Sequence, residues 1–233
     1  MERKTGLIYH ETELGTLYHG DCLQVMKQFA DKSFDLCLTD PPYGVDGGHG
    51  GQLKDYKKAD YISFIDTPEN IIASVVPAVN LCLLLAKTVV LTPGTRCLTF
   101  YPQPDDMGVF YQPANSRIGK FGFQTAQPIF YYGYYKNAGK GALHTSYVLT
   151  EAAEKNGHPC PKPIKAWTWL LLRCSDRGNL VLDPFAGSGT TAIACIRTNR
   201  RYVMIEKEEK YCEIAAKRID TELAQTDFLR GEE

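Results

Sequence analysis

Short apolar runs recur along the chain between longer mixed segments, a pattern typical of buried strands joined by helices. The clearest strand-like runs are residues 16–19, 34–39, 180–182 and 202–206. The runs 16–19 and 180–182 are each followed by a turn and then by a stretch that reads as a helix. Strands that alternate with helices favour an α/β fold with a Rossmann-like, doubly wound, mostly parallel sheet.

Further elements follow from local signals. Asp21 is a plausible N-cap for a short helix over 22–29, and Pro77 is expected to interrupt a helix over 69–87. The patterns also predict a strand at 88–91, an apolar helix at 166–172 and, in the first half of 127–136, the last strand of the core sheet. From 102 to 157 the pattern becomes irregular.

Four acids fall at the ends of the predicted strands: Asp21, Asp40, Asp183 and Glu206. If the four strands are neighbours in the order 180–182, 202–206, 16–19 and 34–39, their carboxyl ends meet at one edge. Ligands bind outside that edge in doubly wound sheets. The sequence therefore predicts one crevice lined by four carboxylates.

The segment Asp183-Pro184-Phe185-Ala186-Gly187-Ser188-Gly189-Thr190 reads as a strand end, a tight glycine turn and a helix start. Glycines allow positive φ and close approach of a ligand to the backbone. The run departs from G-x-G-x-x-G and lacks the lysine of a phosphate-binding loop, which disfavours a nicotinamide, flavin or nucleotide-phosphate site. Glu206 ends the next strand, where an acid bonds ribose hydroxyls in dinucleotide-type folds.

The tetrapeptide Asp40-Pro41-Pro42-Tyr43 directly follows the strand 34–39. Proline fixes φ and supplies no N–H, so the backbone here is rigid and its carbonyls remain acceptors. A carboxylate and a fixed carbonyl beside an aromatic ring suit an exocyclic amino group on a flat heterocycle. The two acceptors would take its two protons, and the tyrosine would stack on the ring.

Together these motifs resemble those of DNA amino-methyltransferases, which methylate adenine N6 or cytosine N4. The resemblance covers roughly 14–45 and 156–219, including the segment around Lys162, and the order of motifs is that of the circularly permuted, beta-type subclass. It implies catalysis by the tetrapeptide, S-adenosylmethionine as cofactor, DNA with the target base turned out of its duplex, and a possible homodimer. The cofactor-binding residues it implies are Asp21, Lys162, Asp183, Phe185, Gly187, Ser188, Gly189, Thr190 and Glu206.

The target base and substrate class are separate questions. Cytosine enzymes of this family tend to carry Ser in place of Asp40, so the resemblance favours adenine N6. Protein-glutamine methyltransferases usually carry Asn there, whereas the motifs do not separate DNA from RNA. The Pro159-Cys160 and Glu69-Asn70 pairs echo cytosine C5-methyltransferases, but here they precede the cofactor motif, which disfavours that class. A catalytically silent nucleic-acid-binding module is the remaining alternative.

At 233 residues the chain is long enough for one domain with a substantial core. The eight cysteines are scattered without a C-x-x-C pair, so we expect reduced thiols, no metal site and a cytoplasmic protein. No apolar run reaches the length of a membrane span and no export signal is evident, so no membrane association is expected.

The net charge of −1 is low for a duplex binder, so a local basic patch is expected to contact phosphates. We expect the segment 102–157 to serve as a target-recognition insertion, because it is rich in basic and aromatic residues and poor in acidic residues. Its candidate nucleic-acid-binding residues are Arg117, Lys120, Lys136, Asn137 and Lys140. The glycine-rich segment 44–51 is predicted to form a lid over the site.

Overall fold

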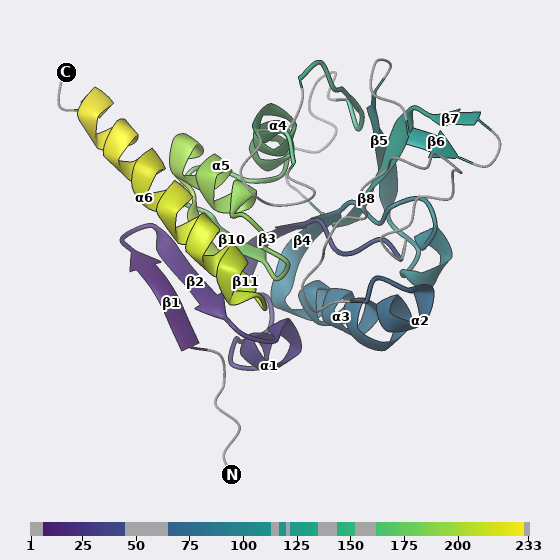
Figure 1. Cartoon of the computed structure of the whole chain (residues 1–233), viewed down its shortest axis with the longest axis horizontal. Helices are drawn as coiled ribbons and strands as arrows, with labels where there is room; N and C mark the ends of the chain where they lie inside the picture. The colour runs from purple at the N-terminus through teal and green to yellow at the C-terminus, as the bar shows by residue number, and fades with distance from the viewer. Residues whose placement is uncertain are drawn as a thin grey trace, which may run out of the picture.

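A nine-stranded sheet with helices on both faces forms the body of the protein (Figure 1). The computed structural model describes residues 7–44, 65–112, 117–119, 122–134, 144–151 and 162–230, with the backbone alone at 117–119, 123 and 227–230. The predicted α/β class with a Rossmann-like, doubly wound, mostly parallel sheet is confirmed, with antiparallel pairs towards both edges of the sheet. The expected lid, apart from Gly44, lies outside the described residues.

The strands of the main sheet follow the order β1-β2-β11-β10-β3-β4-β8-β5-β9. In chain order their bounds are β1 Leu7–Thr12, β2 Gly15–His19, β3 Phe34–Thr39, β4 Ala86–Leu91, β5 Asp106–Tyr111, β8 Ala126–Gly133, β9 Tyr147–Val148, β10 Leu180–Asp183 and β11 Arg201–Glu206. A separate hairpin joins β6 (Arg117–Gly119) to β7 (Gly122–Gln124).

The helices are α1 Cys22–Met26, α2 Pro68–Asn70, α3 Val76–Leu85, α4 Ile164–Cys174, α5 Thr190–Thr198 and α6 Glu209–Arg230, with a π-helical segment at Ile71–Val75 and a 3₁₀ turn at Leu98–Phe100. The π segment lies directly before Pro77, where the sequence predicts an interruption. Helix α1 ends three residues earlier than predicted, at Met26 rather than Phe29.

The centre of the sheet is parallel: β2, β11, β10, β3 and β4 all run in one direction. The predicted neighbours are all present, but their order needs a correction, because β3 pairs with β10 and not with β2. After β10 the chain continues into β11, which lies on one side of β10 in the sheet. After β3 it continues into β4, which lies on the opposite side of β3. The direction of winding therefore reverses between β10 and β3, which is the topological switch point where doubly wound sheets bind ligands.

Two hydrophobic layers hold the helices onto the sheet. Leu36 and Leu38 of β3 face a core shared with α4, α5 and α6, whereas Cys37 between them faces a core shared with α1 and α3. Successive side chains of a strand point to opposite faces, so one apolar strand serves both layers. Figure 1 shows α4, α5 and α6 on one side of the sheet and α1, α2 and α3 on the other.

The segment Pro68–Leu85 is long and apolar enough to cross a membrane by length and composition, although Glu69, Asn70 and Asn80 interrupt its apolar residues. In this fold one face of the segment packs into the core. Ile71, Val75 and Val79 are buried in the same layer as Val89 of β4.

Much of the segment 102–157 belongs to the main sheet. Strand β8 pairs antiparallel with β4, which confirms the strand predicted in 127–136, and β5 pairs antiparallel with β8. The hairpin of β6 and β7 lies outside the main sheet. The seven cysteines within the described residues carry free thiols.

Candidate active site

The four acids lie at the carboxyl ends of four adjacent parallel strands, as the sequence predicts. Asp21 follows β2, Glu206 ends β11, Asp183 ends β10 and Asp40 follows β3. The backbone N–H of Gly20 donates to the Glu206 carbonyl at 2.9 Å. On the other side of the switch point, the Thr39 hydroxyl donates to the Asp183 carboxylate at 2.7 Å. These bonds tie the strand ends into one continuous edge.

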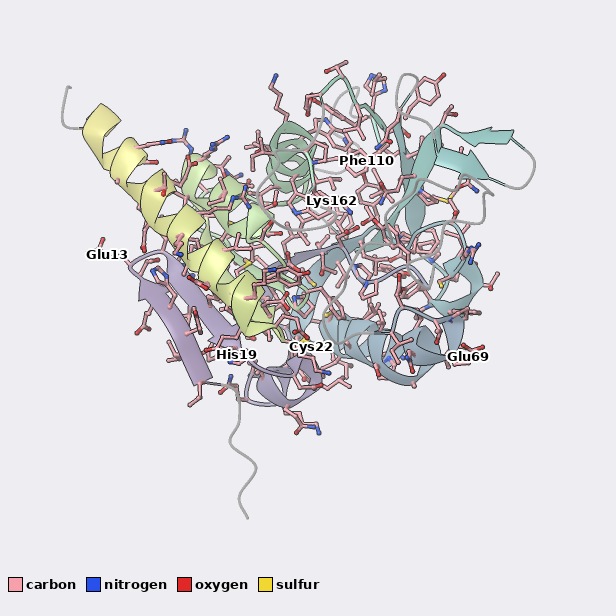
Figure 2. All side chains as sticks on the ribbon, in the orientation of Figure 1. Glu13, His19, Cys22, Glu69, Phe110 and Lys162 are labelled. Carbon is pink, nitrogen blue, oxygen red and sulfur yellow. The ribbon has the colours of Figure 1, made fainter. Side chains whose placement is uncertain are left out.

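Each oxygen of the Asp40 carboxylate has its own set of partners. Oδ1 accepts hydrogen bonds from the hydroxyls of Tyr43 and Thr92. Oδ2 forms an ion pair with the ammonium of Lys162, whose side chain is 12% exposed. Figure 2 labels Lys162, which lies just ahead of α4. The carboxylate is therefore fixed in orientation by two hydroxyls and faces a cation.

The Tyr43 side chain is held at its hydroxyl and along its ring. The Gln127 side-chain amide donates to the Tyr43 hydroxyl. The Lys162 ammonium lies over the ring, 5.2 Å from its centroid. A Cβ at Gly94, where φ is +68°, would lie 2.8 Å from the ring carbons, so glycine is required for the turn after β4 to approach Tyr43.

Contacts from two neighbouring segments of the chain hold the backbone of the tetrapeptide in place. The Gly44 N–H donates to the buried Asp66 carboxylate at 2.6 Å, and the Cys97 thiol contacts the Tyr43 carbonyl at 3.2 Å. Pro41 is buried and Pro42 is half-buried. The rigid tetrapeptide Asp40-Pro41-Pro42-Tyr43, here called the lip, is therefore supported by the segments that follow β4 and precede α2.

Asp183 is buried, and its bonds point inward. Besides the Thr39 hydroxyl it accepts from the Thr191 hydroxyl and, at 3.1 Å, from the N–H of Phe185. Burial raises the pKa of Asp183 to about 6; these three hydrogen bonds oppose the shift, and the Asp40 charge adds to it. The carboxylate thus holds the start of the glycine loop in place.

Glu206 organises the other side of the loop. Its carboxylate accepts from the N–H groups of Gly187 and Glu208, both at 2.8 Å. Burial raises the pKa of Glu206, while the backbone donors oppose the shift. An acid fixed in this way keeps acceptor capacity for further donors, because a carboxylate can accept about four hydrogen bonds.

The glycine loop passes between these two acids into α5. Gly187 and Gly189 both have positive φ. Arg218 of α6 donates to the Ser188 carbonyl, and Thr190 is a buried residue at the first position of α5. Phe185 is half-buried at the start of the loop. A loop without Cβ atoms at two positions, opening a helix beside a carboxylate, fits the adenosine and methionyl parts of a nucleoside cofactor.

Comparison with known proteins agrees with this arrangement. A family model described as DNA methylase, of the N6/N4 class, matches residues 107–217. The Type II methyltransferase M.ScaI of Streptomyces caespitosus is 25% identical over 98% of this chain and 88% of its own length. The DNA adenine methyltransferase YhdJ of Escherichia coli (strain K12) is 25% identical over 89% of this chain and 83% of its own.

Solved structures share the fold. The cytosine-N4-specific PvuII DNA methyltransferase superposes with a TM-score of 0.67 at 15% identity, covering 94% of each chain. The M1.HpyAVI–SAM complex gives 0.64 at 19% identity, covering 88% of this chain and 98% of that one. These matches support a relationship to the N6/N4 class of DNA amino-methyltransferases.

The structure separates the residues that the resemblance groups as cofactor-binding. The glycine loop and Glu206 lie together, and Asp21 is an exposed N-cap of α1 that accepts from the Gln24 N–H at 3.3 Å. Lys162 instead contacts Asp40 and Tyr43. Of the nucleic-acid candidates, Arg117 is described by its backbone in β6, whereas Lys120, Lys136, Asn137 and Lys140 lie outside the described residues.

Sequence reasoning missed several residues that shape the site of this methyltransferase. Thr39 ends β3, Thr92 directly follows the neighbouring strand β4, and Gln127 comes from β8. The threonines could have been found from their positions at strand ends, once the order of strands was known. Gln127 carries no such signal, because its approach to Tyr43 depends on the antiparallel pairing of β8 with β4.

Proposed function

We propose that this DNA amino-methyltransferase methylates adenine N6, with S-adenosylmethionine as the methyl donor. The observation that carries the proposal is the juxtaposition of an oriented carboxylate, Asp40, with a glycine loop and Glu206 at one switch point. The Thr39–Asp183 bond couples the two halves directly. A solved structure of the same fold is a SAM complex, which supports the choice of cofactor.

The cofactor is proposed to lie over the glycine loop. Glu206 would accept the ribose hydroxyls, and Gly187, Ser188 and Gly189 would allow the backbone to approach the ligand. Asp183 contributes through the loop that it holds, since its own carboxylate is buried. When bound, S-adenosylmethionine supplies an activated methyl group on a sulfonium.

Asp40 is proposed to prepare the target amine. The lone pair of an aryl amine is delocalised into the ring, so the nitrogen is a poor nucleophile. If the carboxylate and the Pro41 carbonyl accept its two N–H bonds, the nitrogen becomes more tetrahedral. The carboxylate also stabilises the positive charge that develops on nitrogen, and Asp40 or water then takes the proton.

The choice of adenine over cytosine depends on Asp40, because cytosine enzymes of the family tend to carry Ser at that position. Similarity to a protein named DNA adenine methyltransferase supports adenine. The fold is shared with a cytosine-N4 enzyme, so cytosine N4 is the second candidate.

Duplex binding requires groups that neither the glycine loop nor the lip supplies. We propose that the base is flipped out of its duplex, at a cost of a few kcal/mol, and that basic residues between 102 and 157 contact the phosphates. Arg117, Lys120, Lys136, Asn137 and Lys140 remain the candidates. A second copy of the chain could share this task.

Mass spectrometry of nucleosides tests the reaction and the base together. DNA from cells that overproduce the protein, and DNA incubated with it and S-adenosylmethionine, should gain N6-methyladenine. An Asp40→Ala variant should bind the cofactor normally but lose turnover by ~10²-fold or more, the scale for removing a preorganised polar partner. N4-methylcytosine without N6-methyladenine would overturn the adenine assignment, and full activity of the variant would remove Asp40 from the mechanism.

A further inference from the structure

We infer that Lys162 is a positioning residue of the methyl-transfer site: its ammonium holds the Asp40 carboxylate in the absence of a target base and occupies the place of the target amine. This inference rests on the proposed function. It also reassigns Lys162 from the cofactor site, where the family resemblance puts it.

The hydrogen bonds of Asp40 define which of its oxygens faces the amine. Oδ1 already accepts from the hydroxyls of Tyr43 and Thr92, which are fixed parts of the lip and of the turn after β4. Oδ2 pairs with Lys162 instead. Since the lip residues leave Oδ2 to a side chain from a different segment, Oδ2 is the oxygen suited to accept an N–H bond from the base.

The second contact of Lys162 points to the same place. Its ammonium lies over the Tyr43 ring, 5.2 Å from the centroid, where the proposed mechanism stacks the base. An ammonium offers N–H donors to the carboxylate and positive charge to the ring face. It therefore makes both interactions that the amino group and ring of the base would make, and it must move when the base enters.

Lys162 is also connected to the cofactor half. It precedes α4, which packs against α5. The Trp167 indole N–H of α4 donates to the Thr191 hydroxyl at 2.8 Å, and that hydroxyl donates to Asp183. The helix that follows Lys162 is thus anchored to the helix that begins at the glycine loop.

The charge of Lys162 offsets a concentration of acid around Asp40. The groups that face Asp40 are Lys162, Tyr43, Thr92 and, through charge interactions, Asp183 and Tyr101; Asp66 and Cys97 lie behind the lip. Without the ammonium, no cation among the described residues pairs with Asp40. Loss of this cation is therefore expected to change the pH dependence of the reaction, because an adjacent cation favours the ionised form of a carboxylic acid.

The test is the pH profile of methyl transfer by the full-length protein, with DNA and S-adenosylmethionine, for the wild type, Lys162→Met and Lys162→Arg. We expect Lys162→Met to move the acidic limb of the profile to higher pH by about one unit or more. Lys162→Arg keeps the charge and should keep the limb in place. Calorimetric titration with S-adenosylmethionine should give Lys162→Met the affinity of the wild type within about twofold.

Lys87→Met is a matched control. Lys87 of β4 pairs with Asp35 of β3 at 2.7 Å, on the same two strands but at their opposite ends. Its removal should leave the profile unchanged. Thermal melting establishes that each variant is folded, and Lys162→Gln replaces Lys162→Met if the latter is not.

An unshifted acidic limb in Lys162→Met overturns the inference while leaving the proposed function intact. A tenfold loss of cofactor affinity also overturns it, because Lys162 would then belong to the cofactor site. Failure of the wild-type protein to transfer methyl groups to DNA contradicts the proposed function itself. The wild-type reaction alone shows this outcome, without reference to the Lys162 variants.

Discussion

At the scale of single residues, the acids of the site differ in the donors that surround them. Asp183 accepts from two hydroxyls and one N–H inside the core, whereas Glu206 accepts from two backbone N–H groups at the surface of the loop. Asp40 accepts from hydroxyls on one oxygen and a cation on the other. The hydrogen-bond partners of each acid, and not its residue type, fit it to its role. Asp183 supports the loop, whereas Glu206 is proposed to accept ribose hydroxyls and Asp40 to receive an amine.

Glu206→Ala is expected to weaken S-adenosylmethionine binding by ~1.5–3 kcal/mol, the range for hydrogen bonds to a charged group. The variant removes the acceptors proposed for the ribose hydroxyls and also releases the Gly187 N–H. Calorimetric titration measures the effect, and Glu213→Ala, which removes an exposed acid of α6, is the control. An unchanged affinity would place the ribose elsewhere.

At the scale of elements, the turn from β10 into α5 depends on Gly189. Its φ is +78°, and a Cβ there would lie 3.0 Å from the Cβ of Ala215 in α6. Both a left-handed backbone and close packing between the loop and α6 therefore require glycine at this position.

Gly189→Ala is expected to destabilise the protein by more than the ~1–2 kcal/mol that a left-handed alanine costs. Gly178→Ala isolates that backbone cost, because Gly178 has the same φ of +78° with no atom within 4 Å of the added Cβ. Urea denaturation of both variants gives the comparison. Equal losses of stability would mean that the contact with Ala215 is relieved by a small shift of α6.

Local signals predicted the elements that carry the motifs. The apolar run before Asp40 and the glycine turn after Asp183 are β3 and the entry to α5. The edge strand β1 and the long helix α6 were not anticipated. Strand β1 is mostly exposed, so its position depends on pairing with β2. Helix α6 buries Tyr211, Cys212, Ala215 and Ile219 at helical spacing, a signal from which it could have been predicted.

The candidate site could be predicted in part. Strand-end positions brought the four acids together, because carboxyl ends of parallel strands share an edge. The partners of Asp40 could not be predicted: Thr92, Gln127 and Lys162 come from three separate segments. Their convergence on the lip is set by the order of strands. The predicted order placed β3 beside β2, whereas β3 pairs with β10.

At the scale of the whole molecule, the burial of Asp183 makes stability depend on pH. Burial raises its pKa to about 6 in the folded protein, above its ordinary value of 3.8. The folded state therefore holds this proton more tightly than the unfolded state. The resulting stabilisation is complete below about pH 4 and is lost as the pH rises through about 6, by an amount on the order of 3 kcal/mol.

Asp183→Asn should remove this dependence, since an amide does not titrate in this range. The difference in unfolding free energy between wild type and variant is expected to fall from pH 4 to pH 7. Urea denaturation at a series of pH values measures it. A constant difference would show that the hydrogen bonds from Thr39 and Thr191 cancel the effect of burial.

The order of strands also bears on how the protein is made. Strands β10 and β11 lie between β2 and β3, although about 140 residues of chain separate β3 from β10. During synthesis β2 and β3 emerge from the ribosome early, but each lacks a neighbour until the last quarter of the chain has followed. Such late, long-range pairing is slow and leaves strand edges open meanwhile. A nascent or truncated chain of this kind can pair β3 with β4 behind the Asp40 lip, but it lacks the glycine loop and Glu206, so the complete site has to await the synthesis of β10 and β11.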